Sequence, residues 1–170
     1  MIRCMYLFVI ASTVSFIANS SAGEKVEKQE DPAWPQWRGP NRDGQVGGPA
    51  WPERLSKDSL AQLWRIPLGP SYSGPIVADD LVFTTETKNK QTEIVYALDR
   101  KTGKERWRAE WKGAMQVPFF AAANGSWIRS TPAYDGERLY VAGMLDVLVC
   151  LNAKTGIEEW RYDFAKELKT

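Results

Sequence analysis

The sequence contains no histidine and only two cysteines, Cys4 and Cys150, among its 170 residues. The absence of histidine excludes a Ser-His-Asp triad, an HExxH zinc site and a histidine-bridged metal centre. The 22 basic residues are balanced by 21 acidic residues, so the chain offers no basic field to nucleic acid or to an anionic membrane. We therefore expect no nucleic-acid partner.

Long hydrophobic runs are also scarce, and the longest lies at the N-terminus. Arg3 precedes a mostly apolar stretch over residues 5–18, and residues 20–22 are all small. This order is typical of a cleaved secretory signal, and the run is too short to span a bilayer. We predict a signal peptide over residues 1–22, no transmembrane anchor after cleavage, and a periplasmic or secreted protein. The alternative is an uncleaved N-terminal anchor.

Residues 23–62 show little sign of regular structure. Residues 23–31 are mostly charged, and residues 34–44 are rich in proline, glycine and turn-forming residues. We interpret residues 23–62 as a leader and N-terminal extension. We expect Trp34 and Trp37 to hold this segment onto the rest of the protein.

From residue 63 the chain alternates between short β-branched or aromatic runs and turn residues, which is typical of consecutive strands. We expect strands at residues 75–78, 81–85, 94–98, 105–108, 139–141 and 147–151. The runs 94–98 and 147–151 are continuously apolar, so both faces of their sheets should be covered. Cys150 lies in the second run, and we expect a small buried residue there rather than a nucleophile.

Two stretches of the chain repeat each other about 50 residues apart, at residues 97–107 and 150–160. The matching positions are Ala97, Asp99, Thr102, Gly103 and Trp107 in the first copy, and Asn152, Thr155, Gly156 and Trp160 in the second. The Asp or Asn should accept hydrogen bonds from turn N–H groups, and the glycine can adopt positive φ. The tryptophan should then cover a neighbouring sheet. These roles are structural, and the period predicts blades of a β-propeller.

The two copies resemble the tryptophan-docking repeat of pyrroloquinoline-quinone (PQQ) type β-propellers, patterned Ala-x-Asp-x-x-Thr-Gly-x-x-x-Trp. The first copy matches throughout, whereas the second has Cys150 and Asn152 in place of Ala and Asp. The resemblance implies an all-β fold, a partial β-propeller of four-stranded antiparallel blades over residues 63–170. The blades would lie at about 63–111 and 124–165. Relatives close with about seven or eight blades, so this propeller would be incomplete.

The resemblance also bears on chemistry, because the family includes quinoprotein alcohol dehydrogenases as well as non-enzymatic relatives. The latter include the lipoprotein of the outer-membrane β-barrel assembly machinery. The enzymes hold PQQ over a tryptophan floor and bind Ca²⁺ through carboxylate and amide oxygens, many of them beside a disulfide between adjacent cysteines. This chain has no adjacent cysteines, and no ligand can be carried over to a numbered residue. We predict no catalytic residue, no metal ligand and no cofactor in this chain alone. PQQ and calcium would need blades from a longer protein.

One segment, residues 112–129, is longer than most loops. Its aromatic and cationic residues form a candidate binding loop for an unidentified protein or polymer ligand. These residues are Phe119, Phe120, Trp127 and Arg129. The alternative is that the segment packs into the central channel or against the leader.

The sequence supports two hypotheses about function. The leading hypothesis is a non-catalytic binding or scaffold module, because the repeat motifs are strong and no catalytic site is recognisable. The alternative is the N-terminal part of a PQQ-dependent quinoprotein alcohol dehydrogenase of the polyvinyl-alcohol type. Open blade faces also predict self-association.

Overall fold

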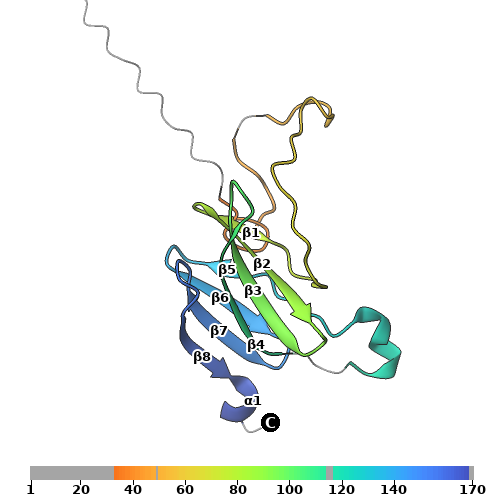
Figure 1. The fold of residues 1–170 in the computed structure, drawn as a ribbon, viewed down its shortest axis with the longest axis vertical. Coiled ribbons are helices and arrows are strands. Elements are labelled where there is room, and N and C mark those ends of the chain that lie inside the picture. Colours follow the sequence, from red (N-terminus) through yellow and green to blue (C-terminus); the bar gives the residue numbers. More distant parts are fainter. Residues whose placement is uncertain (1–32, 49, 114–116, 169–170) are drawn as a thin grey trace, which may run out of the picture. The chain divides into compact units, whose positions relative to one another are not determined.

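The computed structural model describes residues 33–48, 50–113 and 117–168, and these residues form two four-stranded antiparallel sheets (Figure 1). The predicted signal peptide and residues 23–32 of the predicted leader lie outside the described residues. The elements are β1 (Ile76–Ala78), β2 (Leu81–Lys88), β3 (Thr92–Asp99), β4 (Glu105–Lys112), the 3₁₀ helix η1 (Phe119–Asn124), β5 (Ala133–Tyr134), β6 (Arg138–Gly143), β7 (Val147–Asn152), β8 (Glu158–Asp163) and the short helix α1 (Phe164–Glu167).

Each sheet is a simple meander in which every strand pairs with the next strand of the chain. The orders are β1-β2-β3-β4 and β5-β6-β7-β8. Tight turns at positive φ, such as Asp79 at 51° and Asp146 at 51°, allow these short connections. The expected strands are confirmed, although β2 and β4 continue to Lys88 and Lys112, well beyond the expected ends.

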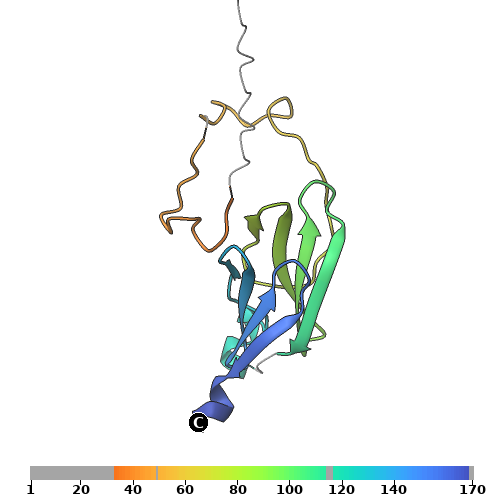
Figure 2. The ribbon, with the colours of Figure 1, turned by 90° about the vertical axis from the view of Figure 1, so that its left-hand side faces the viewer.

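The apolar core lies between the two sheets, which are adjacent in both ribbon views (Figure 2). The first sheet contributes Phe83, Val95 and Trp107, and the second contributes Val141 and Val149, among others. The run 94–98 is buried on both of its faces apart from the half-buried Tyr96, as its continuous apolar character predicts.

Cys150 is a buried free cysteine, as expected. Burial raises the pKa of its thiol, which favours the unreactive protonated form.

The described part of residues 23–62 is attached to the first sheet through one of its tryptophans. The Trp34 backbone exchanges two hydrogen bonds with Val77, at 2.6 and 2.9 Å, and so extends the edge of β1. Trp37 is exposed, so the expectation that it anchors the segment was wrong. Arg38 lies over the Trp37 ring at 5.5 Å, and this local contact leaves the indole facing solvent.

Candidate binding surface

The repeated turns are built as the sequence predicts. In the first turn, Asp99 Oδ1 accepts hydrogen bonds from the backbone N–H groups of Lys101 and Thr102, at 3.1 and 2.8 Å, and from the Thr102 hydroxyl at 2.8 Å. Asp99 Oδ2 also pairs with Arg106 Nη2 at 2.6 Å. The Arg106 and Thr102 bonds hold the pKa of the Asp99 carboxyl well below its usual range.

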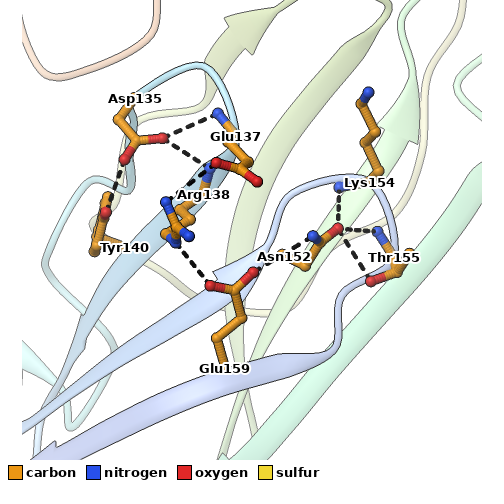
Figure 3. A network of polar contacts seen from close by, with 8 residues as sticks. All are labelled: Asp135, Glu137, Arg138, Tyr140, Asn152, Lys154, Thr155 and Glu159. Atoms are coloured by element: carbon orange, nitrogen blue, oxygen red, sulfur yellow. Dashed lines mark hydrogen bonds and ion pairs between the residues drawn. The ribbon is translucent and has the colours of Figure 1, made fainter.

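The second turn repeats this arrangement with a neutral side chain (Figure 3). Asn152 Oδ1 accepts from Lys154 N, Thr155 N and Thr155 Oγ1, all at 3.1 Å. Glu159 completes the turn, because it accepts from Asn152 Nδ2 at 3.4 Å and from Arg138 Nε at 2.7 Å. The Glu159 carboxylate is therefore occupied in holding this turn together.

Asp135 holds the neighbouring turn in the same view (Figure 3). It accepts from the backbone N–H groups of Glu137 and Arg138, at 2.9 and 2.8 Å, and from the Tyr140 hydroxyl at 2.7 Å. These bonds lower the pKa of Asp135 to about 2.

Each repeated glycine lies under an indole from the preceding part of the chain. Gly103 has φ 69°, and a Cβ there would come within 2.6 Å of the Trp64 ring. Gly156 has φ 73°, and a Cβ there would come within 2.5 Å of the Trp107 ring. Trp64 Nε1 donates to Arg100 O at 2.8 Å, and Trp107 Nε1 donates to Ala153 O at 2.9 Å. Both positive φ and close approach therefore require glycine.

Glu93 is a fully buried carboxylate at the boundary between the sheets, with 0% of its surface exposed. It accepts from Trp111 Nε1 at 2.7 Å and from Met144 N at 2.8 Å, so it joins β4 to the β6–β7 turn. A Cβ at Gly113 or Gly143 would collide with this carboxylate. Burial raises the pKa of Glu93, and the two hydrogen bonds oppose that rise.

Glu93 was not among the residues expected from the sequence to have a special role. The only sequence feature that could have indicated a buried carboxylate was the position of this acidic residue directly before the apolar run 94–98.

Two of the four candidate loop residues form a frame for the loop. The Trp127 and Tyr72 ring centroids are 5.3 Å apart, and the Arg129 guanidinium lies over the Tyr72 ring at 4.9 Å. Arg129 Nη2 also donates to Asn124 O and Gly125 O, at 3.2 and 3.0 Å. Tyr72 was not singled out from the sequence, because its partners lie more than 50 residues away.

The other two candidate residues point into solvent. Phe119 and Phe120 open η1 and are 93% and 79% exposed, with ring centroids 5.7 Å apart in an edge-to-face arrangement. Residues 113–128 carry no charged side chain. Among the described residues neither ring packs against another segment, and the alternative that the segment packs into a central channel stays a prediction. The structure thus separates the candidate residues into a frame, Trp127 and Arg129, and a tip, Phe119 and Phe120.

The described residues offer no obvious metal centre. Nowhere among them do three His, Cys, Asp or Glu side chains gather in a way that could hold a metal ion. In the same part of the chain, we find no helix with the length and apolar character needed to cross a bilayer.

A family model described as "Outer membrane protein assembly factor BamB", from the PQQ-like repeat proteins, matches residues 50–109 and 91–170. The curated "Uncharacterized protein RP232" of Rickettsia prowazekii (strain Madrid E) is 33% identical over 113 residues, which is 63% of this chain and 26% of that protein. The chain therefore spans about a quarter of the length of this curated relative.

Solved structures with similar folds include BamB from Moraxella catarrhalis. It is 19% identical, with a TM-score of 0.47, over 63% of this chain and 29% of that chain. The quinohemoprotein alcohol dehydrogenase from Comamonas testosteroni is 20% identical, with a TM-score of 0.42, over 58% of this chain and 14% of that chain.

Proposed function

This chain belongs to the PQQ-like repeat family described as outer membrane protein assembly factor BamB, and from that membership we propose that it is a non-catalytic binding or scaffold module. Its two sheets are β-propeller blades. The proposed contact surface is the Phe119–Phe120 tip, and the single observation that carries the proposal is its exposure on a framed loop.

Two physical effects favour binding at the Phe119–Phe120 tip: burial of apolar surface and the prior ordering of the loop. Large apolar rings held in water gain free energy when a partner covers them, at roughly 25 cal/mol per Å² of apolar surface. The stack of Tyr72, Trp127 and Arg129 orders the base of the loop before any partner arrives. Less conformational entropy is then lost on binding.

We propose that the protein acts in the periplasm or outside the cell. The apolar run and small residues within residues 1–22 support this location. The description of the matched family, an outer membrane assembly factor, supports a protein partner rather than a small substrate.

The test is site-specific photo-crosslinking in the source cells. A photoreactive phenylalanine analogue replaces Phe120, and the same analogue replaces the exposed Leu60 as a matched control. We expect a discrete crosslinked protein from position 120 that is absent from position 60. The captured protein is then purified, and its affinity for the F119S/F120S variant should fall at least tenfold. Equal affinity for the wild-type chain and this variant would overturn the proposal.

The dehydrogenase alternative makes a separate prediction. We assign no residue to calcium or to the quinone. As part of an enzyme, the chain within its full-length protein should support alcohol-dependent dye reduction after addition of PQQ and Ca²⁺. Turnover in that assay would replace the scaffold proposal with the enzymatic one.

A further inference from the structure

Asn124 ends the helix η1 of the candidate binding loop, and it is the only one of the chain's five asparagines that precedes a glycine. An Asn-Gly pair is chemically labile. Glycine has no side chain to obstruct its own backbone nitrogen when that nitrogen attacks the carboxamide carbon of the residue before it. Asn124 is also exposed, so water reaches the pair.

The carboxamide of Asn124 is not held away from this reaction. Among the described residues it neither donates nor accepts a hydrogen bond, because the contact with Arg129 is made through the Asn124 backbone oxygen, at 3.2 Å from Nη2. Asn152 is the opposite case. Its Oδ1 accepts three hydrogen bonds, its Nδ2 donates a fourth, and the residue that follows it is Ala153.

The nucleophile of the reaction is the backbone nitrogen of Gly125, which has one hydrogen bond to lose. Its N–H donates to Ala122 O at 3.1 Å and so closes η1. No residue of η1 is buried, so little packing opposes the local opening of this turn. Gly125 has φ 64°, and a Cβ there would come within 2.6 Å of the Trp127 ring. The fold therefore requires the glycine that makes Asn124 labile.

We propose that Asn124 is a site of spontaneous deamidation, which gives an uncharged loop a negative charge. The Gly125 nitrogen bonds to Asn124 Cγ, the bond from Cγ to Nδ2 breaks, and the amide proton leaves with Nδ2 as ammonia. One water molecule then opens the resulting succinimide at either of its carbonyl groups. The product at position 124 is aspartate or isoaspartate, and water is the only co-reactant.

The new charge would lie beside the frame of the loop. Residues 113–128 carry no charged side chain, and Arg129 Nη2 donates to the backbone oxygens of both Asn124 and Gly125. Aspartate adds a carboxylate to a residue that this guanidinium already contacts, whereas isoaspartate routes the backbone through an extra methylene group. An effect on partner binding would rest on the proposed function, but the deamidation itself does not. The two proposals therefore fail independently.

Peptide mapping of the folded, full-length protein during storage tests the proposal. Trypsin releases residues 113–129 as one peptide and residues 139–154, with the control Asn152, as another. We expect deamidation of the first peptide to increase with time, faster in mildly alkaline than in neutral buffer, while the second stays unchanged. A synthetic peptide of residues 113–129 gives the rate without the fold. A folded-protein rate within about tenfold of that rate supports the proposal, and a slower rate overturns it.

Two variants confirm the position and the chemistry. N124Q keeps a neutral carboxamide but must form a larger ring to react, so its peptide should keep its mass. S126A removes the Asn-Gly-Ser glycosylation sequon and keeps the Asn-Gly pair, so it should deamidate at close to the wild-type rate. An N124Q peptide that gains the same mass shift, or a glycan on Asn124 in protein from the source cells, would overturn the proposal.

Discussion

The two blades carry the same row of residues in the same register but in different surroundings. Ile76, Phe83, Ala97 and Trp107 run across the first sheet, and Ala133, Tyr140, Cys150 and Trp160 run across the second. Trp107 is 9% exposed beneath the second blade, while Trp160 remains far more open. One motif therefore contributes different amounts of stability, because the energy comes from the neighbouring blade and not from the motif alone.

The largest expected effect tests this difference directly. W107A removes a buried indole and its hydrogen bond to Ala153 O, and we expect a loss of about 3–5 kcal/mol in the free energy of unfolding. W160A removes a partly exposed indole and should cost about 1 kcal/mol. Urea unfolding of both variants measures the gap. Equal losses would mean that the second row is covered in solution.

The two repeated glycines allow a second comparison, because Gly103 and Gly156 have nearly the same positive φ but lie beneath different indoles. G156A and G103A both place a Cβ at similar positive φ, which costs about 1 kcal/mol in each. G156A also displaces the buried Trp107, whereas G103A displaces the half-buried Trp64. We expect the free energy of unfolding to fall by about 3 kcal/mol in G156A and by about 2 kcal/mol in G103A. In thermal unfolding, G156A should have a lower midpoint temperature than G103A. The reverse order would mean that Trp64 contributes more stability on its turn than Trp107 does.

Two acids should give pH dependences of opposite sign. The folded pKa of Glu93 lies above its ordinary value of 4.5, so the stability it contributes is present below that pH and is lost as the pH rises through the folded pKa. The folded pKa of Asp135 is about 2 against an ordinary 3.8, so its contribution is present above 3.8 and is lost as the pH falls through 2.

Unfolding free energies at several pH values separate these two acids. As the pH rises above 4.5, wild type should lose stability relative to E93Q. Relative to D135N, it should gain stability between pH 2 and 4. Parallel profiles for wild type and E93Q would show that the Glu93 carboxyl is not buried in solution.

The smallest effect concerns the acceptor side chain of the repeated turns, which is a charged Asp in the first turn and a neutral Asn in the second. D99N makes the first turn resemble the second and removes the charge that pairs with Arg106. Both groups are near the surface, so we expect a small loss in the free energy of unfolding that fades at high salt. Unfolding of D99N and wild type at low and high ionic strength measures this change, with N152Q as a control for turn geometry. A loss that persists at high salt would mean that the amide fails to hold the turn.

Much of the fold could be predicted because its signals are local. The Asp99 and Asn152 turns need only a short acceptor side chain and a glycine within five residues, and both formed as expected. The apolar runs at 94–98 and 147–151 indicated strands covered on both faces. The strand ends were less predictable, because β2 and β4 extend through charged residues that only cross-strand pairing holds in place.

For the candidate binding loop, the residues could be predicted from the sequence, but their arrangement could not. The sequence placed Phe119, Phe120, Trp127 and Arg129 in one loop but gave no sign of which would face solvent. That depended on Tyr72, whose stacking with Trp127 and Arg129 is a contact between distant segments. Glu93 was missed for the same reason, since its partner Met144 lies 51 positions along the chain.

The sequence by itself determined the repeats, the strands, the turn chemistry and the lack of any histidine-dependent site, since each depends on residue types and short spacings. Only the tertiary structure decided which indole is buried, which ring is displayed and where a buried carboxylate joins the blades. Burial is set by whatever packs opposite a residue. Trp107 and Trp160 carry the same motif, and they differ because the second blade covers one of them.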